Sequence, residues 1–225
     1  MKILPAITTT GQTDWREKIV ELNKLDLTEV CFFPTGLAST ERQEAYKLLK
    51  KSKIKSIPFV HLRSDMSPDE IEFLIANFKT NIFNIHAMSE WPLQYDLSKY
   101  LSQMYLENSA YPMPEAEVKQ LAGVCLDYAH LESRRLEGSP LYSAQYQLFK
   151  KYPIGCAHIS ALSQQAYYNP ERKEIQHDLH RYANLNQFDY LESYKNFLAP
   201  LVAMELTNSI SEQLVAIEYI KKIFK

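Results

Sequence analysis

Glycine is scarce in this sequence, with five residues among 225, and none of them belongs to a glycine-rich phosphate-binding loop. A doubly wound open sheet that binds nucleotides typically carries such a loop after its first strand. Cysteine is also rare, and Cys31, Cys125 and Cys156 lie inside apolar runs without a pairing pattern. These thiols are therefore expected to be buried in a reducing compartment and not to form a disulfide framework.

Long hydrophobic runs are missing as well. No stretch approaches the roughly 20 apolar residues of a membrane helix, and the first fifteen residues become polar too soon for a signal peptide. We therefore expect a cytoplasmic protein without a membrane anchor.

The chain has no large excess of charge of either sign. Its 25 basic and 27 acidic residues leave a formal net charge of −2, which disfavours a mainly electrostatic binder of nucleic acid. Hydrophobic residues make up 46% of the chain and charged residues 23%, as in ordinary globular proteins. Residues 1–225 are expected to form a single domain.

Eight short β-rich segments alternate with helical patterns along the chain. Strands are predicted at 2–9, 29–34, 56–61, 81–86, 103–108, 123–130, 153–160 and 201–206. Helices are predicted at 15–25, 39–51, 67–78, 96–102, 115–121, 139–152, 188–198 and 209–224, with a long polar stretch before the helix at 188–198. This alternation indicates a parallel sheet covered by helices, and eight units favour a (β/α)8 TIM barrel in the α/β class over a doubly wound open sheet.

Histidines and carboxylates gather where the predicted strands end. All six histidines and four carboxylates fall on the side that carries the active site in such barrels: His61, His86, His130, His158, His177, His180, Glu107, Asp127, Asp178 and Glu205. A single histidine at a strand end is more often structural. So many acidic and imidazole groups with few basic partners, however, would be costly to bury without a cation. Imidazole and carboxylate ligands suit zinc, manganese or iron, so the sequence predicts a metal site.

Segments 106–109, 125–130 and 203–207 resemble the xylose isomerase-like TIM-barrel superfamily, which includes sugar isomerases and epimerases and the endonuclease IV type of apurinic endonuclease. The resemblance implies a single-metal quartet, as in the epimerases, formed by Glu107, Asp127, His158 and Glu205. Asp178 and His180 resemble an Asp-x-His pair of the endonuclease type, and His61 and His86 match its histidines on strands 3 and 4.

The resemblance to the endonuclease type implies a cluster of two or three Zn²⁺ ions with Glu107 as the bridging ligand. His61 and His86 would complete one centre. The other two centres would be formed by Asp127, His158 and Glu205 and by His130, Asp178 and His180.

Two loops depart from the endonuclease pattern. Residues 181–186 stand where that family has a glycine-rich turn, and residues 109–112 stand where it has small residues. In the endonuclease type these loops would contact DNA. Because they differ in this sequence, a small phosphoester or sugar phosphate is a more expected substrate than DNA.

Further candidates for substrate contact lie on the same rim. Five arginines are candidate phosphate contacts, with Arg63 and Arg181 closest to the proposed ligands: Arg63, Arg134, Arg135, Arg172 and Arg181. Tyr111 and Tyr182 could stack on a sugar or base, or could equally roof the barrel.

Three functions follow from these residues. The first is hydrolysis of a phosphoester at a multinuclear zinc site. The alternative is a sugar or sugar-phosphate isomerase or epimerase with one Mn²⁺ or Co²⁺ ion, in which Glu107 and Glu205 move a proton. The third is a catalytically silent barrel that binds a metal or a partner. The oligomeric state stays open.

Overall fold

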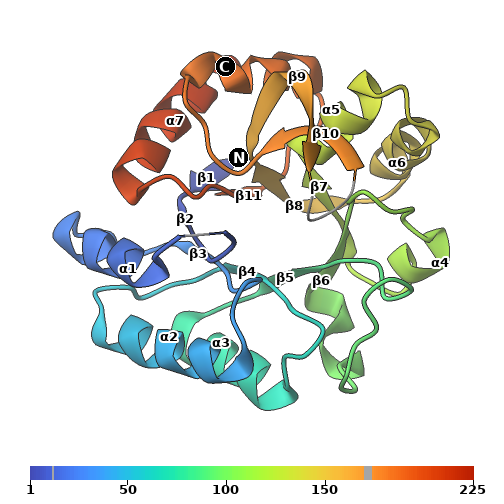
Figure 1. Ribbon diagram of the computed structural model, residues 1–225. Coiled ribbons are helices and arrows are strands. Elements are labelled where there is room, and N and C mark those ends of the chain that lie inside the picture. The colour runs from blue at the N-terminus through green and yellow to red at the C-terminus, as the bar shows by residue number, and fades with distance from the viewer. Residues whose placement is uncertain (12, 170–173) are drawn as a thin grey trace.

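The computed structural model describes residues 1–11, 13–169 and 174–225. Nine parallel strands form one sheet in the order β1-β11-β8-β7-β6-β5-β4-β3-β2. In chain order they are β1 (Lys2–Leu4), β2 (Ala6–Thr8), β3 (Cys31–Phe33), β4 (Phe59–His61), β5 (Ile82–Ile85), β6 (Met104–Glu107), β7 (Gly123–Asp127), β8 (Ile154–Ile159) and β11 (Leu201–Met204). Figure 1 shows these strands at the centre of a ring of helices.

The helices lie outside the strands and connect them. The α-helices are α1 (Trp15–Lys24), α2 (Ser39–Lys51), α3 (Pro68–Phe78), α4 (Glu115–Val118), α5 (Tyr128–Leu136), α6 (Pro140–Lys151) and α7 (Ile210–Ile223). The predicted helices at 96–102 and 188–198 are instead the 3₁₀ helices η1 (Ser98–Gln103) and η2 (Leu185–Tyr194). None of the helices within the described ranges is both long and apolar enough to cross a bilayer.

Pro5 divides the first predicted strand in two, and this division closes the sheet. Proline has no N–H for the strand ladder, so β1 and β2 are separate strands on either side of it. The half before Pro5 pairs with β11, and the half after it pairs with β3. The Pro5 carbonyl accepts the Cys31 N–H at 2.9 Å. Eight strand positions therefore form a closed ring, which confirms the predicted (β/α)8 barrel.

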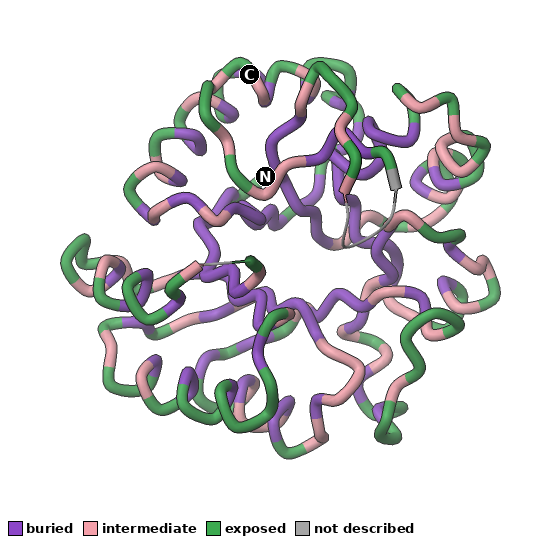
Figure 2. The backbone as a smooth tube through the Cα atoms, in the orientation of Figure 1, coloured by how far each residue is buried: buried purple, intermediate pink, exposed green. Residues whose placement is uncertain are grey.

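The core has two layers because successive side chains of a strand point to opposite faces. Residues such as Phe33 and Phe59 fill the inside of the barrel together with the three cysteines. The cysteines are buried and form no disulfide within the described residues. Their strand neighbours Phe32 and Val60 pack against the helices. Figure 2 shows the buried strands inside a largely exposed outer surface.

The segment 123–130 ends as a strand earlier than predicted. The Asp127 carboxylate accepts the His130 backbone N–H at 2.8 Å and caps α5, a helix that the periodicity did not indicate. His130 therefore lies in the first turn of a helix.

The polar stretch after β8 also differs from the prediction of a loop. It contains an antiparallel hairpin of β9 (Ala161–Asn169) and β10 (Glu174–Leu179). Its register pairs Ile175 with Tyr168, and both of these large apolar side chains are exposed, so the usual alternation of buried apolar and exposed polar residues does not mark the strands here.

Candidate metal centre

Four consecutive positions of the ring bring together the residues of the expected quartet. Glu107 ends β6, Asp127 ends β7, His158 lies in β8 and Glu205 follows β11. All four are buried. Because β6, β7, β8 and β11 are neighbours in the parallel sheet, these side chains meet at its carboxyl end.

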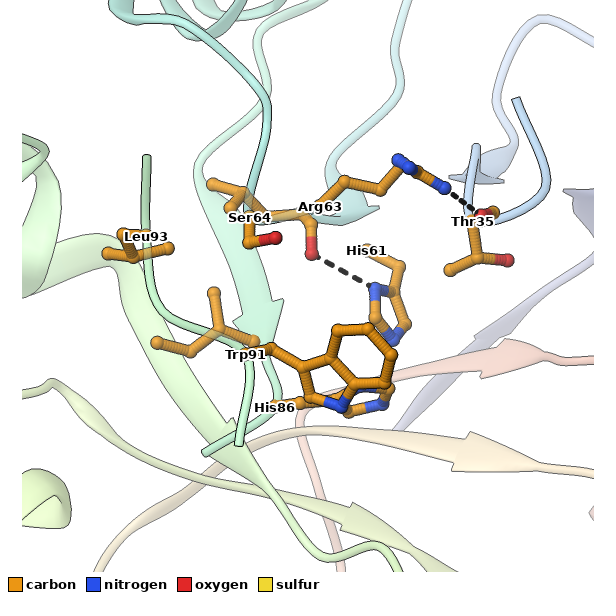
Figure 3. A pocket seen from close by; sticks show the side chains of 9 residues that line it. Thr35, His61, Arg63, Ser64, His86, Trp91 and Leu93 are labelled. Carbon is orange, nitrogen blue, oxygen red and sulfur yellow. Dashed lines mark hydrogen bonds between the residues drawn. The ribbon is translucent and has the colours of Figure 1, made fainter. Parts of the chain in front are cut away.

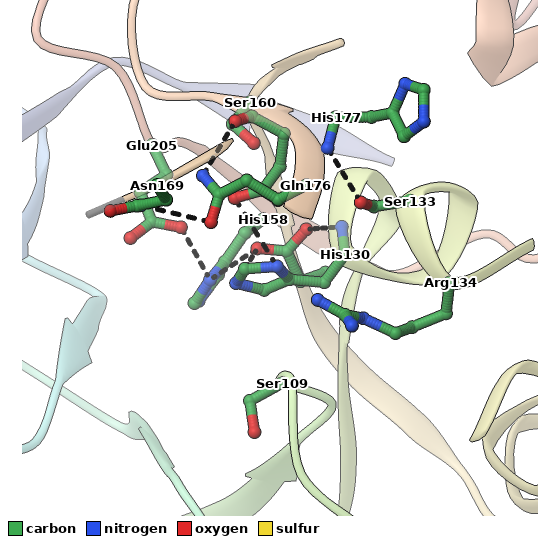
Figure 4. A network of polar contacts seen from close by, with 12 residues as sticks. Ser109, His130, Ser133, Arg134, His158, Ser160, Asn169, Gln176, His177 and Glu205 are labelled. Atoms are coloured by element: carbon green, nitrogen blue, oxygen red, sulfur yellow. Dashed lines mark hydrogen bonds and ion pairs between the residues drawn. The ribbon is translucent and has the colours of Figure 1, made fainter. Parts of the chain in front are cut away.

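His158 Nδ1 faces the carboxylates of the other three residues, and Figure 4 shows His158 beside Glu205. This nitrogen lies 3.4 Å from Glu205 Oε2, 3.8 Å from Glu107 Oε1 and 3.9 Å from Asp127 Oδ2. Donor atoms that share one zinc ion at about 2.1 Å lie roughly 3.0–3.5 Å apart. Glu107, Asp127 and His158 have donor atoms within 4.8 Å of one another and suit a single divalent ion after a small contraction, whereas Glu205 lies outside that group and would have to move closer to join it.

A second group of donors shares Glu107. His61 Nε2 lies 3.1 Å from Glu107 Oε2, and His86 Nε2 lies 3.5 Å from Glu107 Oε1. The other ring nitrogen of His61 lies 3.3 Å from the Leu62 carbonyl, which can only accept. In a neutral ring, the Nε2 lone pair therefore faces a carboxylate oxygen, an arrangement that a shared cation would stabilise.

Unsatisfied atoms provide an independent test of whether a metal fits. Asp127 Oδ2 and His158 Nδ1 are buried and make no hydrogen bond within the described part of the chain. An unsatisfied buried polar atom costs about 1–3 kcal/mol. A divalent cation would take up the Asp127 lone pair together with His158 Nδ1, so the residues present fit such an ion.

Burial and the neighbouring charges shift the pKa values of the three carboxylates in different directions. Burial raises the pKa of Glu205, but His180 and His158 outweigh it and lower that pKa to about 2. Burial likewise raises the pKa of Glu107, and His158, His86 and His61 bring it well below its ordinary value. The pKa of Asp127 is instead well above its ordinary value, because of burial and of the charges on Glu205 and Glu107.

The residues expected at a third centre lie nearby but gather less closely. His130 lies 3.8 Å from Asp127 Oδ2 and 3.6 Å from Asp178 Oδ2. Asp178 comes from β10 of the hairpin, and His180 follows that strand. Among the described residues, two groups of three donors lie within 4.8 Å: His61, His86 and Glu107, and Glu107, Asp127 and His158. The set of His130, Asp178 and His180 is not such a group.

Two asparagines that the sequence analysis passed over hold the ligands. Asn84 of β5 donates to Glu107 Oε2. Asn108 accepts the Asp127 N–H at 2.7 Å and donates to the Asp127 carbonyl at 2.9 Å. Asn84 is a polar residue within the apolar strand β5 and Asn108 directly follows β6, and these positions were the available signal.

The predicted substrate-binding residues have different surroundings. Arg63 lines a hollow beside His61 and His86, whereas Arg181 lines a separate hollow near Lys18. Tyr111 is exposed, and the Tyr182 hydroxyl donates to the Glu212 carbonyl at 2.8 Å, which ties it to α7. Contact of these four residues with a substrate stays a prediction.

The remaining candidate arginines are engaged elsewhere or lie outside the description. Arg134 pairs with Glu137 at 2.8 Å and Arg135 with Glu132 at 2.6 Å, both along the same helical segment. Arg172 lies outside the described residues.

Comparison with known proteins gives matches among solved structures alone. No family model and no curated protein matches the chain. A xylose isomerase domain protein from Alicyclobacillus acidocaldarius subsp. acidocaldarius is 14% identical, with a TM-score of 0.51 over 99% of this chain and 98% of that one. The holo form of the aldo-keto reductase AKR11C1 from Bacillus halodurans is 12% identical, with a TM-score of 0.52 over 99% and 92%. A D-tagatose 3-epimerase-like protein is 13% identical, with a TM-score of 0.46 over 99% and 97%.

These likenesses concern the fold. The chain is similar to xylose isomerase-like TIM-barrel proteins. This agrees with the broader resemblance read from the sequence, while the endonuclease IV subtype stays a prediction. At 12–14% identity the comparisons show the fold alone and give no support to the expected phosphoester hydrolase.

Proposed function

We propose that this barrel is a divalent-metal-dependent isomerase or epimerase that acts on a sugar or sugar phosphate. The observation that carries the proposal is the order in which the four ligand candidates follow one another on neighbouring strands of the barrel. Glu107 and Glu205 occupy the two ends of this order, with Asp127 and His158 between them. The xylose isomerase type of one structural neighbour supports the same chemistry.

This order suits proton transfer on a bound sugar. When bound, a divalent ion would polarise a substrate carbonyl or hydroxyl oxygen and make the adjacent C–H bond more acidic. Either glutamate, in its ionised form, can accept the proton from that carbon. Returning the proton to the neighbouring carbon isomerises the sugar, whereas inversion of the original carbon requires the opposite glutamate to start protonated and to donate that proton to the other face.

The chain's other residues position the two glutamates for this step. Asn84 holds one oxygen of Glu107, while His158 Nδ1 lies 3.4 Å from Glu205. Burial of both carboxylates excludes bulk water from the reacting carbon.

A second candidate is the phosphoester hydrolase with a multinuclear zinc site. The specific observation in its favour is the contact of both His61 and His86 with Glu107, which would allow Glu107 to bridge two ions. Paired ions would activate a water and stabilise the phosphoryl oxygens.

Metal content and proton exchange separate the two candidates. For the proposed enzyme we expect one tightly held divalent ion per chain and exchange of a sugar C–H proton in D₂O. His61→Ala should keep that ion. Two or three zinc ions per chain, with phosphodiester turnover that His61→Ala abolishes, would replace the isomerase by the hydrolase.

A further inference from the structure

A hollow of about 470 Å³ opens where the first turns of α1 meet the loop that leads into α7. Figure 1 shows these two helices as neighbours on the outside of the barrel. Lys18 of α1, which the proposed mechanism does not use, is one of the lining residues, and Thr207 and Arg181 are others. None of the metal-ligand candidates in the described part of the chain lines this hollow, so it is separate from the metal centre.

Lys18 is a buried lysine whose amine contacts neutral oxygen atoms. The residue is 3% exposed. Its Nζ donates to the Thr8 hydroxyl at 2.8 Å and to the Leu206 carbonyl at 2.7 Å. These two hydrogen bonds use both hydrogens of a neutral amine and leave its lone pair available, whereas an ammonium ion has a third hydrogen to satisfy. The arrangement therefore suits the uncharged form of the side chain, which is the nucleophilic form.

Burial keeps much of this amine uncharged near neutral pH. It lowers the pKa of Lys18 to about 7, against the opposing charges of Glu21 and Glu212. An exposed lysine has a pKa near 10.4 and is almost entirely protonated at pH 7, so its uncharged fraction is of order a thousand-fold smaller. Desolvated lysines of this kind are the ones that form imines with carbonyl compounds.

The charges around the hollow favour an uncharged ligand. Besides Lys18, the charged residues that line it are three acids and one base: Asp14, Glu17, Glu21 and Arg181. Glu212, the second acid that acts on Lys18, lies in the first turn of α7. An anion would enter a hollow with an excess of carboxylates, which repel it. A positive charge that forms on Nζ after a neutral molecule has bound would instead be stabilised by Glu21 and Glu212.

We propose that Lys18 is a covalent site for a short, uncharged aldehyde, which enters this hollow and forms an imine with Nζ. The amine lone pair attacks the carbonyl carbon, and one amine proton moves to the carbonyl oxygen to give a carbinolamine. The hydroxyl group then leaves with the second amine proton as water, and the C=N bond forms. The imine nitrogen takes up a proton from water, and no oxidant or reductant takes part. The site uses no residue of the metal centre and does not depend on the proposed isomerase.

Reductive trapping tests this site on the folded, full-length chain. We would treat the protein at pH 7 with glycolaldehyde and cyanoborohydride and locate the modified lysines by peptide mass spectrometry. Lys18 should be labelled at least about ten-fold faster than Lys24, an exposed lysine of the same helix, because so much more of its amine is uncharged. Glyoxylate, an aldehyde that carries a carboxylate, should label Lys18 more slowly than glycolaldehyde does. Equal labelling of the two lysines, or faster labelling of Lys18 by glyoxylate, would overturn the proposal.

Two further measurements connect the reactivity to the folded site and need no variant. The labelling rate of Lys18 should rise between pH 6 and 8 and then level off, whereas that of Lys24 should keep rising towards pH 10, since each rate follows the uncharged fraction of its amine. In urea the two lysines should react equally fast. A rate at Lys18 that keeps rising to pH 10, or a preference for Lys18 that survives unfolding, would contradict the proposal. Lys18→Met should remove the label from this helix position and leave that on Lys24.

Discussion

Asn84 donates its side-chain N–H to Glu107 Oε2, the same oxygen that lies 3.1 Å from His61 Nε2. The other carboxylate oxygen of Glu107 faces His86 and His158. One amide on β5 therefore sets the rotation of the carboxylate that both metal-ligand groups share.

Replacing this amide should impair the site without removing a ligand. We expect Asn84→Leu to lower kcat or metal affinity about 10- to 100-fold, as is typical when a group that orients a metal ligand is lost. Sugar turnover and metal titration would measure the change. Asn77→Leu, on the exposed side of α3, is the matched control, and equal effects of both variants would refute a role for Asn84.

His158 should be the residue on which metal binding depends most. Its Nδ1 faces three carboxylates, so His158→Ala is expected to release the ion, as measured by elemental mass spectrometry after dialysis. His177→Ala alters another buried histidine, whose Nδ1 lies 2.9 Å from the Ser163 carbonyl, and should retain the ion. Full metal content in His158→Ala would contradict the quartet.

Asp65 should control which substrates the hollow beside His61 and His86 accepts. Asp65→Asn leaves Arg63 without its carboxylate partner, so binding of sugar phosphates should improve several-fold relative to neutral sugars. Binding of neutral sugars and of the corresponding phosphates, compared by saturation-transfer NMR, measures this ratio. Asp69→Asn on the exposed start of α3 is the control, and circular dichroism checks that loss of the Arg42 contact leaves the fold intact. An unchanged ratio in folded Asp65→Asn would show that Arg63 does not set the preference.

Lys18 should make stability depend on pH. Burial lowers the pKa of Lys18 from its ordinary value of 10.5 to about 7, against the opposing charges of Glu21 and Glu212. Between these values the unfolded chain binds more protons than the folded one, so Lys18 contributes a stability that rises with pH. Because one pKa unit corresponds to about 1.4 kcal/mol, the rise from pH 7 to 9 should reach a few kcal/mol.

Urea unfolding at several pH values measures this slope. Lys18→Met should flatten it, whereas Lys24→Met at the exposed end of α1 should not. A slope that persists in Lys18→Met would assign the effect to another group.

The ring of strands could be predicted because its signals are local. Apolar β-rich segments followed by helical periodicity predicted all eight strand positions, and Pro5 divides the first for a reason visible in the sequence. The strand-end positions of Glu107, Asp127 and Glu205 followed from the same pattern. His130 lies just past β7, as expected, but the helix α5 that contains it was not predicted, because a side-chain cap from Asp127 and not periodicity decides where β7 gives way to α5.

The hairpin and the hollow could not be predicted in the same way. β9 and β10 pair with exposed apolar side chains such as Tyr168 and Ile175, so Asp178 looked like a loop residue. Nothing in the sequence indicated that Trp91 would line the hollow beside His61 and His86 (Figure 3). A single tryptophan in a polar segment forms no periodic pattern of apolar residues. The position of Trp91 depends on the hydrogen bonds from Glu117, 26 positions further along the chain.

The sequence by itself determined the barrel, the strand-end acids and histidines, and the scarcity of glycine-rich loops, because each depends on residue type and short-range spacing. Only the tertiary structure decided which donor atoms lie close enough to share an ion and which carboxylates pair with the arginines. Those properties depend on distances between strands and on partners such as Asp65 for Arg63, which neighbouring residues in the sequence do not specify.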